Sequence, residues 1–201
     1  ASVFAWYSSE KIGEYETRHP NGSAAIVRYR DNIGTAITYG FETMFEWNIN
    51  NTFFKEKKAF AWSAFTNVAI TDSQYLESDA PNIEGNKVEF VPLFNIKTGT
   101  AMGYKNFMAS VQFTYLSSQY TDANNSLTDI NDNTYGIFGQ IPEYYVADFS
   151  CSYTLKNWKF EGGITNFTDN DYYTRRATGY PGPGIIPSDG RLFYTTVGFI
   201  F

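Results

Sequence analysis

Hydrophobic and polar residues alternate with a period of two along most of this chain, which is the spacing of a β-strand whose two faces meet different surroundings. The segment 144–155 shows this alternation most regularly. Its polar face carries Asp148, Ser150, Ser152 and Thr154, and its apolar face carries Tyr145, Ala147, Phe149, Cys151, Tyr153 and Leu155. The pattern predicts a strand with an apolar environment on one side and a polar environment on the other.

Seven further segments follow the same design. They are 2–8, 37–49, 58–70, 94–102, 107–117, 158–167 and 191–201. Together they predict an all-β fold of about eight antiparallel strands, most of them close to the roughly 9–11 residues that a tilted strand needs to cross a bilayer. The last segment is predicted to be a membrane-insertion strand, because one of its faces is apolar up to the final residue. The lipid-facing residues of this strand are Phe193, Val197, Phe199 and Phe201.

The predicted connections between these strands alternate between short and long. The short ones centre on 50–57, 104–106 and 156–157, and the long ones cover 10–33, 73–87, 119–143 and 168–190. Short turns at one end and long polar loops at the other are typical of outer-membrane β-barrels. We therefore expect a multi-pass barrel in the cell outer membrane, with the long loops outside the cell and the end of the last strand on the periplasmic side.

Composition supports a membrane-facing sheet. Aromatic residues make up 19% of the 201 residues, yet the mean hydropathy is −0.35, so apolar and polar residues are interleaved. No stretch approaches the roughly 18 consecutive apolar residues of a membrane helix, and a membrane protein without helices must be a closed barrel. The net charge of −6 and the absence of a basic patch argue against nucleic-acid binding. The single Cys151 excludes an intrachain disulfide and a cysteine-based metal site.

The charged residues within the strands indicate which face is the inner one. Glu42, Glu46 and Asp148 would be costly against lipid, so the face that carries them is predicted to line a wet lumen. The predicted lumen-facing residues are Glu42, Glu46, Lys97, Asp148 and Glu161, and Lys159 shares their face. Tyr and Trp residues near the strand ends are expected at the membrane interface.

Two short patterns near the end of the chain resemble a known family. Asn166, Phe167, Asp169 and Tyr172 end an inner strand and lead into a long loop, after which Gly190, Arg191 and Tyr194 begin a terminal aromatic strand that ends at Phe201. This arrangement resembles the C-terminal end of TonB-dependent outer-membrane receptors. Upstream, Tyr39, Gly40 and Glu42 are similar to the family's Y-G-x-E strand. The loop 175–191 looks most like the ferric-citrate-type branch.

The resemblance implies energised import of a scarce ligand, often a ferric chelate. In this family a barrel of about 22 strands encloses a plug domain, and the TonB–ExbB–ExbD system pulls on the plug. The chain contains neither a plug nor a TonB box, and its first residues read as the middle of a strand. We therefore expect residues 1–201 to be the C-terminal portion of the barrel, with the plug domain and the N-terminal strands absent. The expected partners are outer-membrane lipids, the remainder of the barrel and the plug domain.

Candidate ligand-binding residues lie in and beside the last long loop. They are Arg175, Arg176, Tyr180 and Arg191. Guanidinium groups suit an anionic chelate because they bind carboxylates in a bidentate manner. The same arginines also fit plain loop charges or contacts to lipopolysaccharide phosphates. Tyr172, Tyr173 and Tyr180 either stack on a ligand or pack the loop. The charged inner-wall residues either contact a plug or are simply solvated.

The sequence offers little for catalysis or metal binding. Asp122, Asp129 and Asp132 are spaced as in some calcium loops, although a polar external loop also explains them. His19 is the only histidine and lies beside Pro20. No nucleophile motif, zinc motif or phosphate-binding glycine loop is present. We predict no enzymatic activity, no cofactor and no resident metal.

Two other functions remain open from the sequence. A complete barrel of about eight strands would enclose only enough space for its own side chains, and it would serve as an adhesin or a structural protein. A soluble carbohydrate-binding β-protein is the other alternative, but it leaves the lipid-facing terminal strand unexplained.

Overall fold

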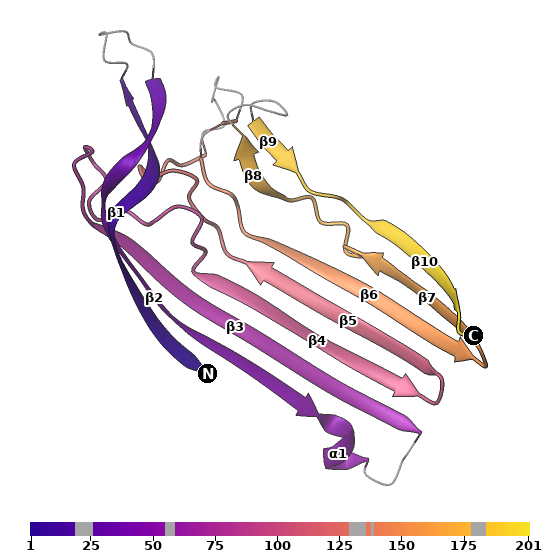
Figure 1. The fold of residues 1–201 in the computed structure, drawn as a ribbon. Helices are drawn as coiled ribbons and strands as arrows, with labels where there is room; N and C mark the ends of the chain where they lie inside the picture. Colours follow the sequence, from indigo (N-terminus) through magenta and orange to yellow (C-terminus); the bar gives the residue numbers. More distant parts are fainter. Residues whose placement is uncertain (19–25, 55–58, 129–135, 138, 178–183) are drawn as a thin grey trace.

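The computed structural model describes residues 1–18, 26–54, 59–128, 136, 137, 139–177 and 184–201. Its main element is an eight-stranded antiparallel sheet whose strands follow the order of the chain (Figure 1). The strands are β1 (Ser2–Arg18), β2 (Ile26–Asn48), β3 (Phe60–Glu77), β4 (Phe94–Tyr104), β5 (Phe107–Leu116), β6 (Tyr144–Leu155), β7 (Trp158–Thr165) and β10 (Leu192–Phe199). Each of them overlaps one of the predicted segments, with ends that differ by a few residues in most cases, so the all-β, antiparallel prediction is confirmed.

Three smaller elements complete the structure. The strands β8 (Tyr173–Ala177) and β9 (Gly184–Pro187) form a separate two-stranded sheet, and α1 (Ile49–Phe53) is a single helical turn. The sequence pattern predicted none of the three. None of the helical structure in the described residues has the length and apolar character needed to span a membrane.

The sheet is open. Strands β1 and β10 lie at its opposite edges and do not pair with each other. Lipid cannot satisfy the backbone groups of a free edge, so a membrane-spanning sheet of this kind needs further strands to close it. The structure therefore contradicts the alternative of a complete eight-stranded barrel and fits part of a larger one.

The prediction of a long loop at 10–33 is wrong. Strands β1 and β2 have 17 and 23 residues and remain paired up to Arg18 and Ile26. Their hairpin extends beyond the rest of the sheet at the long-loop end (Figure 1). Register shifts follow Ser8 and Lys11, and Gly34 has a φ of 147°. Above this irregularity Tyr15 and Ile33 pack against an apolar core beneath the long connections, and the apolar residues of the segment do not recur with a period of two.

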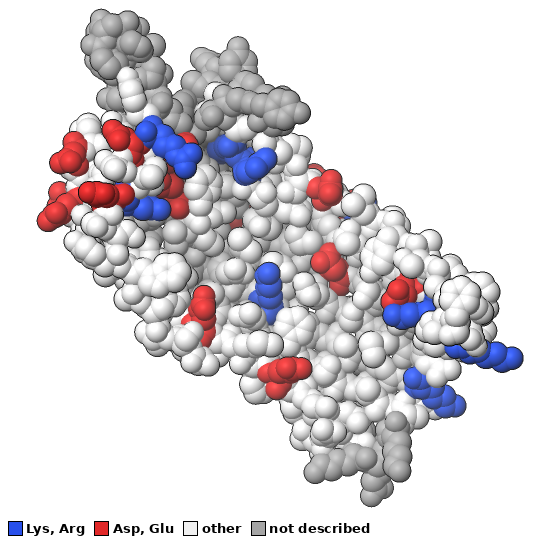
Figure 2. All heavy atoms as spheres, in the orientation of Figure 1, with Lys and Arg blue, Asp and Glu red and all other residues white. Residues whose placement is uncertain are grey.

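The register gives the sheet two chemically different faces. Ala69 pairs with both Glu42 and Asn95, and Asn67 pairs with Lys97, so these side chains share one face. Pairing of Gln112 with Asp148 and of Ser152 with Glu161 extends the same face across β5, β6 and β7. The five predicted lumen-facing residues therefore lie on one face, which we call the inner face. Figure 2 shows charged side chains widely spaced over the strands and gathered at the long-loop end.

The opposite face, called the outer face, is apolar and has aromatic residues close to the short turns. The aromatic side chains near these turns are Trp47, Trp62, Tyr104, Phe107, Tyr153, Trp158 and Phe199. The rings of Trp158 and Phe199 meet edge-on with centroids 4.8 Å apart. Rows of aromatic rings at this level are typical of a membrane interface, because the Tyr and Trp rings among them have an apolar body and a polar hydroxyl or N–H group that can face water.

On the inner face, three glycines lie beneath aromatic rings of neighbouring strands. The pairs are Gly40 with Phe4, Gly99 with Phe65, and Gly163 with Tyr194. A Cβ atom on Gly163 would lie 2.5 Å from the carbonyl oxygen of Phe149 and 2.6 Å from the ring of Tyr194. Only glycine therefore lets each ring lie directly against the backbone of the sheet.

The connection predicted as a plain short turn at 50–57 begins with helix α1. The side chain of Asn48 caps this helix by accepting a hydrogen bond from the backbone N–H of Asn51 at 3.0 Å. The indole Nε1 of Trp47 donates to Oγ1 of Thr52 at 2.9 Å. These contacts attach the turn to the end of β2.

Candidate functional site

The long connections fold into an organised layer at one end of the sheet. Residues 78–93 and 117–128 pack over the upper inner face of β1, β2 and β3. They enclose a small apolar core made of Ile33, Ala36, Tyr75, Ile83, Val88 and Ala123. The hydroxyl of Tyr75 donates to Oε2 of Glu89 at 2.8 Å, so the polar end of this buried ring is satisfied.

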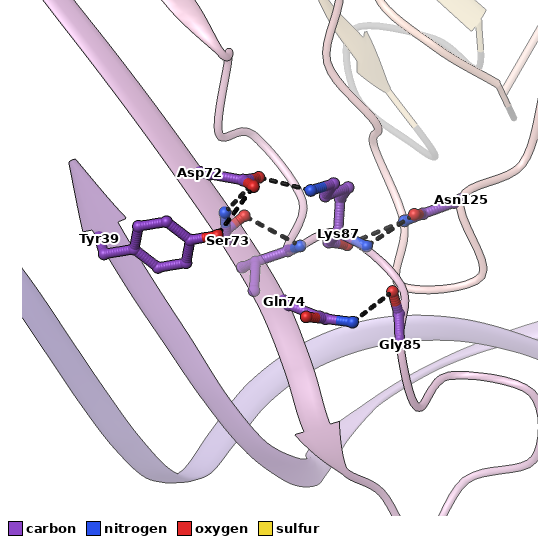
Figure 3. Close-up of polar contacts among 8 residues, drawn as sticks. Tyr39, Asp72, Ser73, Gln74, Gly85, Lys87 and Asn125 are labelled. Atoms are coloured by element: carbon purple, nitrogen blue, oxygen red, sulfur yellow. Dashed lines mark hydrogen bonds and ion pairs between the residues drawn. The ribbon is translucent and has the colours of Figure 1, made fainter.

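Reciprocal hydrogen bonds tie these two connections together. The side chain of Asn125 accepts from the backbone N–H of Lys87 at 2.7 Å and donates to its carbonyl oxygen at 2.8 Å (Figure 3). Asn86 Nδ2 donates to the carbonyl oxygen of Ala123 at 2.8 Å. The backbone N–H of Phe90 donates to the carbonyl oxygen of Tyr120 at 2.9 Å. The two connections therefore form one continuous, hydrogen-bonded surface.

The upper edge of β3 is completed by the connection that follows it. The backbone N–H of Tyr75 donates to the carbonyl oxygen of Asn86, and the N–H of Gly85 donates back to the carbonyl of Tyr75, both at 2.9 Å. Side chains of β3 reinforce this docking, since Ser73 Oγ accepts from the N–H of Val88 at 3.2 Å (Figure 3). The prediction of a loop that begins at residue 73 is therefore wrong, because β3 continues to Glu77.

A charge on the outer face escaped the sequence analysis. Asp72 pairs with Tyr39 across β2 and β3, on the apolar side of the sheet. Its carboxylate accepts from Lys87 Nζ at 2.5 Å and from the hydroxyl of Tyr39 at 3.1 Å (Figure 3). Tyr39, which lies opposite Asp72 on the outer face, is a possible hydrogen-bond donor to this carboxylate. Lys87 lies in the following connection, and the sequence alone does not indicate that it pairs with Asp72.

The N-F-x-D pattern at the end of β7 forms a tight, self-bonded turn. Asn166 is buried and has a φ of 48°. Its Oδ1 accepts from the N–H of Asn170 at 3.1 Å, and its Nδ2 donates to the carbonyl oxygen of the same residue at 2.9 Å. The backbone N–H of Asn166 donates to Oδ1 of Asp148 at 2.8 Å, so one of the inner-wall acids anchors this turn.

Two further motif residues hold the ends of the last long connection. Asp169 contacts both the backbone and the guanidinium of Arg191, which begins the return to β10. The ring of Tyr172 stacks on that of Tyr144, with centroids 4.7 Å apart. The pattern that resembles the family therefore has a structural explanation, because it fixes where the last loop leaves and rejoins the sheet.

Arg176 is built into the structure of the loop. It is 8% exposed. Its guanidinium donates to the carbonyl oxygen of Gly136 at 2.7 Å, to that of Gln140 at 2.8 Å and to Oγ1 of Thr128 at 3.0 Å. It also lies over the ring of Tyr173, at 5.3 Å from the centroid. In this conformation the side chain fastens the β8–β9 hairpin to the preceding connection.

The other predicted ligand-binding residues are not brought together. Arg175 is exposed on β8, whereas Arg191 lies at the level of Phe167 and Phe193 beside an apolar hollow of the outer face. Tyr180 lies outside the described residues. Ligand binding by Arg175, Arg176, Tyr180 and Arg191 stays a prediction, and the described geometry favours Arg175 as the freest of the three arginines.

The inner-wall charges are spread over the sheet. Lys159 Nζ and Glu161 Oε1 form an ion pair at 2.7 Å, while Glu42, Glu46 and Lys97 are exposed. Their predicted contact with a lumen or a plug stays a prediction.

The residues considered for metal binding give no site in the described part of the chain. Asp122 is fully buried, and its Oδ1 accepts from the N–H and Oγ of Ser126. Asp129, Asp132 and His19 lie outside the described residues. Among the residues that are described, no group of three His, Cys, Asp or Glu side chains is close enough to hold a metal ion.

The fold and its two faces define a class. An antiparallel sheet with an apolar, aromatic-edged outer face, a polar inner face, short turns at one end and long connections at the other is part of an outer-membrane β-barrel. Residues 4–167 match the model of the family described as TonB dependent receptor-like, beta-barrel. The chain therefore belongs to the TonB-dependent receptor family, as a part of its barrel. None of the curated proteins compared with the chain matched it.

Solved structures show the same fold. The ferric citrate transporter FecA in its unliganded form has a TM-score of 0.70 at 19% identity, over 94% of this chain and 27% of that one. The copper transporter OprC has a TM-score of 0.64 at 16% identity, over 99% of this chain and 29% of that one. The ferric yersiniabactin uptake receptor FyuA from Yersinia pestis has a TM-score of 0.65 at 17% identity, over 99% of this chain and 34% of that one. The chain thus spans about a third or less of these proteins.

Proposed function

We propose that this chain forms the C-terminal portion of the barrel of an outer-membrane active transporter that imports a ferric chelate. The observation that carries the proposal is the family match over residues 4–167 of a sheet that is open at both edges. Such a sheet needs the remainder of the barrel. A plug domain and the TonB–ExbB–ExbD system are the partners that the proposal adds, together with outer-membrane lipids around the apolar face.

The organised layer at the long-loop end supports a role in ligand capture. Residues 78–93 and 117–128 are fixed to each other by backbone and side-chain hydrogen bonds, so a ligand that binds there would not have to order them first. Binding, and not bond-making chemistry, is what this arrangement offers, and the proposed role is non-enzymatic. A ligand of the ferric-citrate type is the narrower version of the proposal, and it rests on the resemblance of the loop 175–191.

The test uses the full-length polypeptide that contains this chain. A strain lacking it should take up less radiolabelled iron from a ferric chelate, and a plasmid copy should restore uptake. Dissipating the proton gradient, or deleting TonB, should abolish the restored uptake. Uptake that persists without TonB would contradict active transport.

Electrophoresis gives an independent measurement on the same material. Unboiled outer-membrane protein should migrate as a compact, heat-modifiable species that contains more polypeptide than the 22.8 kDa of this chain. A single species of that mass, before and after boiling, would contradict the larger barrel.

A further inference from the structure

A hollow of about 490 Å³ lies on the inner face, between the strands and one of the long connections. Its walls come from β1, β2, β3 and the start of β4, and residues 90–92 close it from the long-loop end. Its size is within the range of sites for small ligands. The hollow is separate from Arg175, Arg176 and Arg191, none of which lines it.

Aromatic rings dominate one side of this hollow. Phe4 and Trp6 project from β1 onto the inner face, with ring centroids 5.8 Å apart and planes inclined by 49°. Phe4 is held in place because its ring lies over Gly40, where a Cβ atom would be 2.7 Å away. The ring of Trp6 lines the hollow beside that of Phe4.

Phe90 supplies a third ring, from the connection that precedes β4. Its backbone has a φ of 59°, an unfavourable conformation for a bulky side chain. The hydrogen bond from its N–H to the carbonyl oxygen of Tyr120 holds it there, although the side chain is 51% exposed and gains little from packing. Strain that persists without burial is a feature of residues positioned for contact with a ligand.

The charge of the hollow is negative. Glu42 is the sole charged side chain among the described residues that line it. Within the described part of the chain Glu42 has no ion-pair partner, and Lys97, on the same face, does not line the hollow. A compact polyanion would meet uncompensated repulsion here, whereas a cation would gain from both the carboxylate and the aromatic faces.

We infer that this hollow binds a neutral or cationic part of the ligand that carries a flat apolar ring, and that it discriminates against compact carboxylate chelates. The inference rests on the proposed function and narrows its substrate class. It predicts that ferric citrate is a poor ligand, in spite of the resemblance of the last loop to the ferric-citrate branch. The rings of Trp6 and Phe90 would contact the apolar group while Glu42 selects its charge.

The test measures binding to the purified full-length receptor by calorimetry. Three probes are compared: ferric citrate, a ferric trihydroxamate with a free ammonium group, and an uncharged ferric chelate with phenolate rings. We expect ferric citrate to bind at least about tenfold more weakly than the uncharged ring-bearing chelate. Glu42→Lys should reverse the charge preference, strengthening ferric citrate and weakening the ammonium-bearing chelate by about tenfold each.

Further variants separate the ring contact from folding. Trp6→Ala should weaken the ring-bearing chelate by about tenfold, while Trp6→Phe keeps a ring and should retain most of the affinity. Heat-modifiable migration establishes that each variant has folded. Glu143→Gln removes an exposed charge that lies just before β6, outside the hollow and outside residues 78–93 and 117–128, and it serves as the matched control, with unchanged selectivity.

The outcomes separate this inference from the proposed function. Tight binding of ferric citrate that is unaffected by Glu42→Lys would overturn the inference and leave chelate import standing. Unaltered selectivity in both Trp6→Ala and Glu42→Lys would show that another part of the protein, such as a plug domain, fills the hollow, and would also overturn it. Failure of all probes to bind, together with absence of TonB-dependent iron uptake, would overturn the proposed function itself.

Discussion

The backbone N–H of Arg191 donates to Oδ1 of Asp169 at 3.3 Å, and the guanidinium of the same arginine lies 3.4 Å from Oδ2. One carboxylate thus joins the start of the last long connection to its end. Because both side chains are well exposed, the ion pair itself contributes little, about 0.2–1 kcal/mol. The backbone contact contributes independently of the arginine side chain.

Asp169→Ala should therefore loosen the last connection more than Arg191→Ala does. Alanine removes both contacts and also disfavours the φ of 58° at this position. Asp169→Asn keeps the acceptor and tolerates the backbone conformation, so it should behave like Arg191→Ala. Protease cleavage of the connection on intact cells measures the difference. Equal cleavage rates for Asp169→Ala and Arg191→Ala would show that the backbone contact is unimportant.

Arg176 and Arg175 are neighbours in sequence with opposite surroundings. Arg176→Ala should free the β8–β9 hairpin, because the carbonyl groups of Gly136 and Gln140 lose a charged donor, at about 1–3 kcal/mol. Arg175→Ala is the matched control and should leave the hairpin protected. The rate of backbone amide hydrogen exchange in β8 and β9, measured for each variant, tests both expectations. Rapid exchange in the Arg175 variant alone would contradict the assignment.

Gly163 and Gly162 offer a test of the aromatic–glycine pairs. Gly163→Ala should lower the free energy of unfolding by about 1–3 kcal/mol, because its Cβ collides with backbone and with the ring of Tyr194. Gly162→Ala should change it by less than about 0.5 kcal/mol, since the nearest atom to a Cβ there is 3.5 Å away. Urea unfolding of the full-length receptor in lipid vesicles provides the comparison. A larger effect at Gly162 would show that the inner-face packing is not as described.

Asp72 and Lys87 place an ion pair on the outer face. Lys87→Ala should lower the free energy of unfolding by about 1 kcal/mol, because it leaves a carboxylate uncompensated beside lipid. Adding Asp72→Asn to this variant should restore most of the loss, since the unpaired charge disappears. A double-mutant cycle in the same unfolding assay measures the coupling. Strictly additive effects would mean that the pair does not interact in the membrane.

The sequence was informative wherever the membrane imposes two different environments on a strand. Strands β4, β5 and β6 alternate because lipid and lumen demand different side chains, and their inner-face residues Lys97 and Asp148 could be assigned by parity alone. The upper β1–β2 hairpin was missed because its apolar residues do not alternate regularly with polar ones. Tyr15 and Ile33 pack there against a core that the long connections complete, and Gly34 reads as a loop residue.

The candidate site was harder to predict, because it depends on contacts between connections. Nothing in the sequence indicates that Arg176 donates to carbonyl groups 36 and 40 positions away. Asn125 likewise forms hydrogen bonds with the backbone N–H and carbonyl oxygen of Lys87. Contacts with backbone groups cannot be recognised from the sequence, because every residue has the same backbone groups. Tyr75 and Ile83 form part of a buried core in a region that reads as a polar loop.

The aromatic–glycine pairs also affect how much space remains inside the barrel. A ring of the size of Phe4, Phe65 or Tyr194 that stood upright on the inner face would reach toward the axis and narrow the passage. Because each ring lies flat on a bare stretch of backbone, it adds apolar area to the wall and takes little of the free cross-section. The same sheet can thus present apolar area on its inner face without large side chains that project far from it.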